Sequence, residues 1–185
     1  MTNLSALPNN LPTPRDDGAC NHLIGKPLPD VFLASTQNTS INLSTIKGWL
    51  VVYCYPMTGK PGIPLPSGWD EIPGARGCTP QSCAYRDNFA AFGRLKTQVF
   101  GLSTQPAEYQ LEAANRLALP YLLVSDEKLD FARALNLPIF YVEDMQLIKR
   151  LTLIVHNGVI QHCFYPVFPP DKNAEEVIDW LTSHV

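Results

Sequence analysis

The stretch GARGCTPQSCAYRD, residues 74–87, brings two of the five cysteines, Cys78 and Cys83, close together in the chain. From Cys78 onward the residue pattern predicts an amphipathic helix that can continue to about Lys96. A cysteine at a helix start faces free backbone N–H groups and the positive end of the helix dipole, which favour the charged form of the sulfur. Arg76, two residues earlier, adds to that field. The stretch therefore contains a candidate thiolate.

The spacing between Cys78 and Cys83 limits how their thiols can meet. Along an ideal helix, two Cα atoms five residues apart lie roughly 8 to 9 Å from each other. A disulfide needs a Cα–Cα separation below about 7 Å. A bond between the two cysteines would therefore require the first turns of the helix to unwind. Pro80 is compatible with this opening, because it fits a first helical turn but donates no hydrogen bond.

The segments around this helix alternate between strand and helix patterns. The apolar run 49–55 predicts a buried strand before the helix, and Asn157-Gly158 is typical of a β-hairpin turn. We expect a hairpin within 27–44, strands over 99–103, 121–124, 151–155 and 159–165, and helices over 106–117, 127–135 and 174–183. This order predicts an α/β protein with a thioredoxin-like fold, in which a central mixed β-sheet is flanked by helices.

The composition along the chain indicates an arm, one domain and a long loop. Residues 1–22 are polar and contain proline, which predicts a mobile or wrapping N-terminal arm before a domain over 23–185. Within the domain, eight of the sixteen residues in 59–74 are Gly or Pro, which excludes a helix or a central strand and predicts a loop. Ile63, Leu65 and Trp69 suggest that this loop packs against the domain.

Charge and composition exclude several classes of partner. The net charge of -3 and the absence of a basic run give no surface for nucleic acid or an anionic membrane. The N-terminus lacks the features of a signal peptide, and no apolar run approaches the ~20 residues of a membrane span. An odd number of cysteines without a regular framework suits a reducing compartment. We therefore expect a cytoplasmic protein.

The run GCTPQSCAYRDNF, residues 77–89, resembles the peroxiredoxin family, specifically its bacterioferritin-comigratory (Q-type) branch. The segments VFGLS (99–103), LPYLLVSDEKLDFARALNLP (119–138) and RLTLIV (150–155) resemble family stretches in the same order, so the resemblance covers roughly residues 24–183. It implies that Cys78 is the peroxidatic nucleophile and Cys83 the resolving thiol. It also implies that Arg150 approaches the reactive sulfur and the bound peroxide.

The chain departs from the family pattern just before Cys78. Family members carry a threonine three residues before the peroxidatic cysteine, with a proline closely upstream, but Ala75 stands at the threonine position. The segment YPMTG, residues 55–59, resembles the start of the family motif, with the 59–74 loop inserted before its last part. On this interpretation Pro56 shields the pocket and Thr58 supplies the hydroxyl.

The resemblance implies a thiol peroxidase that reduces hydrogen peroxide and organic hydroperoxides through a cysteine sulfenic acid. An intramolecular disulfide between Cys78 and Cys83 would follow, and thioredoxin or a similar dithiol would reduce it. No metal, haem or flavin cofactor is implied, and a monomer or a homodimer would serve. Two alternatives stay open: a thioredoxin-type disulfide carrier, which usually has a Cys-x-x-Cys motif, and a non-enzymatic redox sensor that uses the same pair as a switch.

The remaining cysteines have less specific interpretations. Cys54 lies in the predicted buried strand and is expected to be a packed core thiol. Cys163 beside His162, and Cys20 two residues before His22, resemble half of a metal site, but a zinc site needs four convergent ligands. A thiol in the N-terminal arm could also act as an additional resolving group, which leaves the role of Cys20 open.

Overall fold

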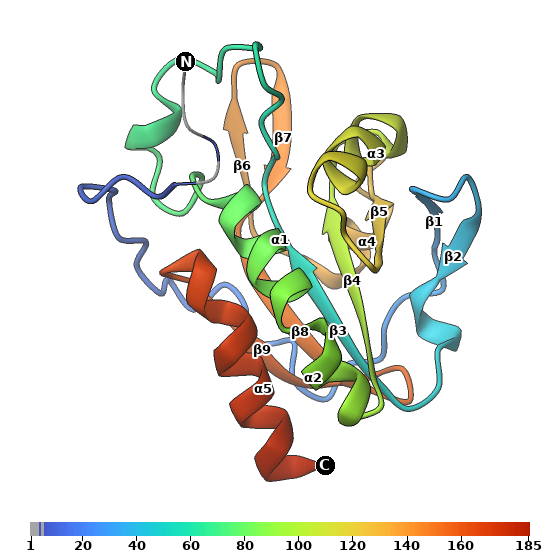
Figure 1. Ribbon diagram of the computed structural model, residues 1–185. Coiled ribbons are helices and arrows are strands. Elements are labelled where there is room, and N and C mark those ends of the chain that lie inside the picture. The colour runs from blue at the N-terminus through green and yellow to red at the C-terminus, as the bar shows by residue number, and fades with distance from the viewer. Residues whose placement is uncertain (1–3, 5) are drawn as a thin grey trace.

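A computed structural model of the protein describes residue 4 and residues 6–185. Seven strands form its central sheet: β1 (Phe32–Ser35), β2 (Ser40–Asn42), β3 (Trp49–Cys54), β4 (Thr97–Ser103), β5 (Leu122–Ser125), β8 (Leu151–His156) and β9 (Val159–Phe164). Their spatial order is β2-β1-β5-β4-β3-β8-β9 (Figure 1). Strands β3, β4 and β5 are parallel, whereas the other neighbours are antiparallel. The expected mixed sheet and the N-terminal hairpin are confirmed.

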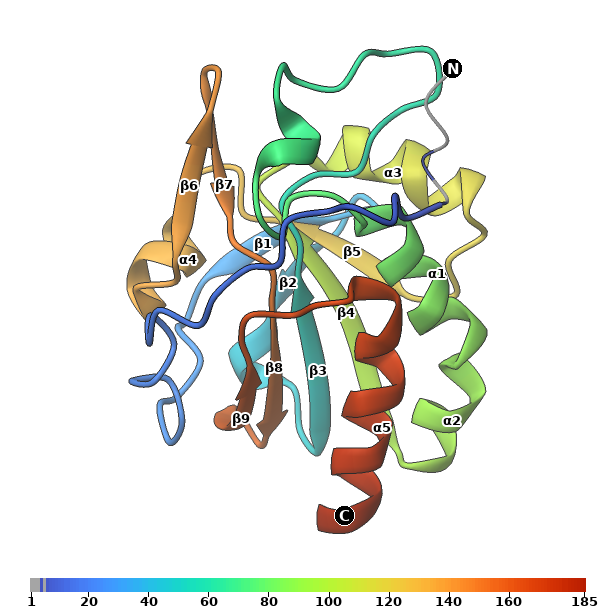
Figure 2. The same ribbon diagram turned by 90° about the vertical axis from the view of Figure 1, so that its left-hand side faces the viewer.

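Helices cover both faces of this sheet. They are α1 (Cys78–Asp87), α2 (Phe89–Arg94), α3 (Ala107–Arg116), α4 (Asp130–Leu135) and α5 (Asn173–His184). Figure 2 shows α1, α2 and α5 on one side of the sheet and α4 on the other. Side chains of strand β3 point alternately to the two faces of the sheet, and each face is covered by helices. Both sets of side chains are therefore buried, and the strand is apolar along its whole length. Val51 and Tyr53 pack with α1 and α5, whereas Leu50, Val52 and Cys54 pack with α4.

Gly101 in β4 makes room for a tyrosine ring at the centre of the sheet. Tyr53 is fully buried and stacks on Tyr85 of α1, with ring centroids 4.4 Å apart and planes 10° from parallel. A Cβ atom at Gly101 would lie 2.7 Å from the Tyr53 ring and 2.5 Å from Leu123 Cδ2. Because neither neighbour is at a flexible surface, any side chain at position 101 would displace packed core atoms.

The Gly/Pro-rich loop over 59–74 packs against a hairpin that the sequence pattern did not predict. Strands β6 (Ile139–Val142) and β7 (Met145–Ile148) form a separate two-stranded sheet beside the loop. Trp69, in a short 3-10 helix of the loop, is 3% exposed and lies 6.3 Å from the Phe140 ring of β6. Leu65 is partly buried in the same cluster, but Ile63 is 58% exposed, so the expectation that it packs is wrong.

Two helix boundaries differ from the sequence-based expectation. The helix expected to begin at 127 begins at Asp130, because Leu129 adopts a left-handed conformation with φ +59° and ends a turn. The Asp126 carboxylate then accepts hydrogen bonds from the N–H groups of Phe131 and Ala132, which satisfies the free donors of α4. The helix expected to continue to 96 is divided at Asn88, whose side chain donates to the Ala84 carbonyl oxygen.

The lengths of the helices bear on whether any of them could span a membrane. Among residue 4 and residues 6–185, no helix combines the length and apolar character needed to cross a bilayer. The longest of the five α-helices, α5, has twelve residues, and only one of its faces is buried.

Replacing Gly101 with alanine tests the packing of the sheet centre. We expect Gly101→Ala to lower the free energy of unfolding by about 1–3 kcal/mol, because the new methyl group overpacks the contact with Tyr53 and Leu123. Urea unfolding followed by circular dichroism measures the change. The control is Gly93→Ala in α2, where a Cβ meets nothing within 4 Å, and its stability should be unchanged or slightly higher. Equal stability of both variants would contradict the close packing at position 101.

Candidate active site

Cys78 is the first residue of α1, and the backbone before it needs a glycine. Gly77 caps the helix in a left-handed conformation with φ +107°. A Cβ atom there would collide with Pro170 and would lie 2.8 Å from Leu7 Cδ2. The close approach of these chains leaves Cys78 only 3% exposed, with its thiol 3.6 Å from the Ala75 carbonyl oxygen. The sulfur is therefore buried at a helix N-terminus.

The guanidinium group of Arg150 also contacts the Cys78 sulfur. It lies between β7 and β8, is 3% exposed, and donates from Nη2 to Cys78 Sγ at 3.1 Å. Nε donates to the Gly74 carbonyl oxygen at 3.2 Å, and Nη2 also reaches the carbonyl oxygens of Ala75 at 3.0 Å and Arg76 at 3.3 Å. A permanent cation at this distance stabilises negative charge on the sulfur. The planar N–H donors of the guanidinium group can also hold a bound oxygen in a fixed direction relative to the sulfur. The structure thus brings Cys78 and Arg150 together.

A chain of buried polar side chains holds Arg150 and α1 in place. Arg150 Nη1 donates to the side-chain oxygen of Gln81, and Gln81 Nε2 donates to Asn173 Oδ1 at 3.1 Å. The hydroxyls of Tyr85 and Thr152 both donate to the same oxygen at 2.7 Å. Apart from Arg150, none of these polar residues was predicted from the sequence to belong to the site. The available signal was position, because Gln81 lies three residues after Cys78 and hence on the same helix face.

The inserted loop holds a second arginine at the site. Arg76 is 6% exposed and forms an ion pair with Asp70 of the loop, with Nη1 and Oδ1 3.3 Å apart. Arg76 and Cys78 line one small recess together with Leu4, Met57, Gly59, Leu65, Trp69, Gly77 and Thr79. From the sequence, Arg76 was expected only to add positive charge near Cys78. The ion pair between Arg76 and Asp70 depends on the path of the loop, which no local pattern predicts.

Thr58 and Pro56 lie in the segment between β3 and the loop. Both are buried, and the Thr58 hydroxyl donates to Gln105 Oε1 at 3.1 Å. Gln105 also accepts from the Thr58 N–H at 2.8 Å and donates to the Thr58 carbonyl oxygen at 3.1 Å. The Pro56 carbonyl oxygen accepts from the Ser103 hydroxyl at 2.9 Å. The polar atoms of Thr58 are therefore directed to Gln105, whereas Cys78 bonds to Arg150 and Ala75.

Cys83 lies in the second turn of α1 with its side chain half-buried. Its thiol is free, as are those of the other four cysteines. Burial raises the pKa of Cys83, and the nearby Arg86 guanidinium offsets part of that effect. The Arg86 guanidinium also pairs with Asp87 at 2.8 Å and donates to the Leu117 carbonyl oxygen at 2.8 Å. In this closed helix Cys83 is therefore a protonated thiol.

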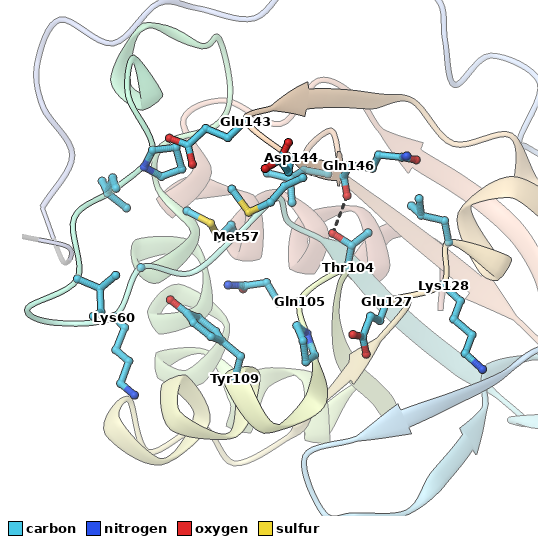
Figure 3. Close-up of a pocket in the computed structure, with 18 of the residues that line it drawn as sticks. Met57, Lys60, Thr104, Gln105, Tyr109, Glu127, Lys128, Glu143, Asp144 and Gln146 are labelled. Carbon is cyan, nitrogen blue, oxygen red and sulfur yellow. Dashed lines mark hydrogen bonds between the residues drawn. The ribbon is translucent and has the colours of Figure 1, made fainter.

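A larger pocket of about 810 Å³ lies on the other side of the Met57–Gly59 segment. Figure 3 shows Met57 and Gln105 at its base, Lys60 and Tyr109 along one side, and Glu143 and Asp144 along the other. Apolar side chains form much of its lining, namely Met57, Ile63, Leu65, Leu129, Met145 and Leu147. The pocket shares Met57, Gly59 and Leu65 with the recess that contains Cys78. A pocket with a mixed apolar and charged lining therefore adjoins the recess that contains Cys78.

The two candidate half-sites for a metal have other contacts. His22 Nε2 lies 2.9 Å from the Leu135 carbonyl oxygen, and the His162 ring stacks on Trp180 with centroids 5.3 Å apart. Within the part of the chain that the structure describes, no three His, Cys, Asp or Glu side chains are grouped to hold a metal ion. Cys54 is fully buried in β3, as expected of a core thiol.

Comparison with known proteins identifies the family. The redoxin family model matches residues 23–178. Peroxiredoxin Q from the chloroplast of Oryza sativa subsp. japonica is 30% identical over 97% of this chain and 75% of its own length. The corresponding protein of Sedum lineare is 31% identical over 86% of this chain and 77% of its own length.

Solved structures support the same fold. Peroxidoxin BcpB from Mycobacterium tuberculosis superposes with a TM-score of 0.72 at 22% identity, over 89% of this chain and 99% of its own. A Cys-to-Ser mutant of PrxQ from Xylella fastidiosa gives a TM-score of 0.71 at 22% identity, over 88% of this chain and 98% of its own. These likenesses confirm the thioredoxin-like fold. The chain belongs to the redoxin family and, within it, to the Q-type peroxiredoxins, which are thiol peroxidases.

Proposed function

We propose that Cys78 is the peroxidatic cysteine and that it reduces hydrogen peroxide and organic hydroperoxides. The observation that carries this proposal is the 3.1 Å contact between Arg150 Nη2 and Cys78 Sγ, buried at the N-terminus of α1. The sulfur attacks the terminal peroxide oxygen, the O–O bond breaks, and water or an alcohol leaves. The Arg150 guanidinium and the N–H groups of the first helical turn stabilise the charge that develops on the oxygens.

Oxidation of Cys78 weakens the contact that keeps α1 closed. A sulfenic acid carries no full negative charge, so the charge-assisted hydrogen bond from Arg150 becomes weaker. The first turn, which contains Pro80, can then open and expose Cys83. Exposure removes the burial that raises the Cys83 pKa, so its thiolate becomes available to attack the sulfenic sulfur and release water. We infer that an intramolecular Cys78–Cys83 disulfide results.

A dithiol protein of the thioredoxin type is the proposed reductant of this disulfide. Every side chain assigned to the reaction comes from one copy of the chain, so a monomer can complete the cycle. A reducing compartment such as the cytoplasm would supply this reductant. Pro56 and Thr58 are proposed to position the segment that separates the recess from the larger pocket, with Thr58 acting through Gln105.

Replacing Cys83 separates peroxide reduction from recycling. We expect Cys83→Ser to consume one equivalent of peroxide at Cys78 and then to show no sustained thioredoxin-dependent turnover, because the Cys78 sulfenic acid has no resolving partner. A stopped-flow peroxide assay with thioredoxin, thioredoxin reductase and NADPH measures both phases. Cys78→Ser should show no peroxide consumption at this site, and full turnover by Cys83→Ser would assign resolution to another cysteine. Disulfide exchange without peroxide consumption by the wild type would favour a disulfide carrier.

Replacing Arg150 tests its contact with the sulfur. We expect Arg150→Met to lower the second-order rate constant of Cys78 oxidation by about 100- to 1,000-fold, the usual cost of losing a donor that stabilises a transition state. Arg150→Lys, which keeps the charge but loses the fork, should fall between this variant and the wild type. The control is Arg94→Met, an exposed arginine of α2. An unchanged rate constant in folded Arg150→Met would contradict the assigned role.

The larger pocket is proposed to hold the apolar part of an organic hydroperoxide. The substitution Met145→Trp narrows the pocket of Figure 3. We expect it to lower the rate with cumene hydroperoxide about 5- to 10-fold, because the apolar part of this substrate can no longer be buried in the pocket. The rate with hydrogen peroxide should be unchanged. Tyr141→Trp is the matched control, because Tyr141 lies on the same hairpin, is 68% exposed and does not line the pocket. Equal losses with both peroxides would contradict this role of the pocket.

A further inference from the structure

The N-terminal arm lies beside β9, the edge strand of the sheet. At one end of the contact, the Tyr165 hydroxyl donates to Asp17 Oδ1 at 2.9 Å. At the other end, the Gly25 N–H donates to the Ile160 carbonyl oxygen at 2.8 Å. The two segments of the chain therefore run in opposite directions, with residues 17–25 beside residues 160–165. Cys20 and Cys163 lie between these two fixed points.

Cys20 and Cys163 meet inside this contact. Cys20 is 4% exposed and belongs to the core on the α4 side of the sheet, and Cys163 of β9 is half-buried and packs against that core. The neighbouring Cys163 side chain, together with burial, raises the pKa of Cys20. Of the two sulfurs, that of Cys163 is the more accessible. Thiols in such contact need only a small movement to form a disulfide.

The remaining core cysteine is a less suitable partner. Cys54 of β3 faces the same core as Cys20 but is fully buried, and burial raises its pKa. It lies in a central strand paired on both sides, with β4 and β8, so its backbone cannot shift toward another thiol without disrupting the sheet. The described part of the arm belongs to no strand of the sheet and is held by single contacts, such as those of His22 with Leu135 and of Asp17 with Tyr165. Its backbone can adjust more readily as a result. The geometry therefore favours the Cys20–Cys163 pair over any pair with Cys54.

We propose that Cys20 and Cys163 form a second redox-active pair, which fastens the N-terminal arm to β9 as a disulfide. A hydroperoxide supplies the oxidising equivalents. The Cys163 sulfur attacks the peroxide, the O–O bond breaks, water or an alcohol leaves, and Cys163 becomes a sulfenic acid. The Cys20 sulfur then attacks the Cys163 sulfur, forming the S–S bond. The hydroxyl of the sulfenic acid leaves as water with the Cys20 proton, so two thiols have donated two electrons.

This pair would act on the segment that overlies the peroxidatic site. Leu4 lines the recess that contains Cys78, and Leu7 lies over Gly77. Residues 13–15 line a second pocket, of about 370 Å³, together with Gly74 and Arg150. Figure 2 shows the arm crossing the molecule between the Cys20 region and the start of α1. A bond at Cys20 would therefore fix the base of the segment that covers the reactive sulfur.

The test uses the full chain with the first pair removed. Reduced Cys78→Ser/Cys83→Ser protein is treated stepwise with hydrogen peroxide, alkylated and digested, and its cysteine peptides are mapped by mass spectrometry. We expect a peptide that links Cys20 to Cys163, with Cys54 alkylated. A link to Cys54, or Cys163 oxidised to sulfinic acid while Cys20 remains a free thiol, would overturn the proposal. This outcome is independent of the peroxidase activity, because Cys78 is absent.

Two further measurements keep the test decisive if the double variant folds poorly. In the wild type, each disulfide removes two titratable thiols, so oxidation of both pairs should leave one of the five, at Cys54. Cys54→Ser should retain the Cys20–Cys163 link, whereas Cys20→Ser should lose it. The bond closes a loop of roughly 140 residues, so we expect the oxidised form to melt at least about 4 °C higher. A wild type that never loses more than two thiols would overturn the proposal.

Discussion

The site depends on one buried cation. The Arg150 guanidinium bonds to three consecutive carbonyl oxygens, to Gln81 and to the Cys78 sulfur, so it joins the end of the inserted loop, the start of α1 and the entry to β8. A buried charge is costly unless its donors are satisfied, and here backbone and side-chain acceptors surround it. The Cys78 sulfur completes this set. In the proposed mechanism, peroxide oxidises the sulfur that Arg150 contacts, so the chemistry and the stability of the first helical turn are coupled.

Backbone groups at the end of the inserted loop form part of this site. At the position where the family carries a threonine, Ala75 contributes only its backbone carbonyl, which contacts both Cys78 and Arg150. The loop in turn supplies Asp70 to the neighbouring Arg76 and Trp69 to the β6–β7 hairpin. Thr58 is held by Gln105 on the far side of the segment. The described contacts of the Cys78 sulfur are therefore with a backbone carbonyl and a guanidinium group.

Several parts of this arrangement follow from residue patterns alone. The apolar run of β3 indicates a strand covered on both faces, and Asn157-Gly158 fixes a hairpin, because these signals depend on neighbouring residues. Cys78, Cys83 and Arg150 could be selected from motifs that resemble a family. The β6–β7 hairpin was missed because its stability comes from packing against Trp69 of a distant loop. The start of α4 was misplaced because the cap at Asp126 acts through a turn that ends at Leu129.

The sequence by itself determined the order of the strands and helices apart from the β6–β7 hairpin, and it placed a thiol pair at a helix start, since these features rest on local periodicity and on the preferences of single residues. Only the tertiary structure decided which polar groups share a buried space. The Gln81–Asn173 contact joins residues 92 positions apart, and the Tyr165–Asp17 hydrogen bond joins the arm to the end of an edge strand. Such contacts satisfy buried donors and acceptors wherever the folded chain brings them together, and no local pattern encodes those distances.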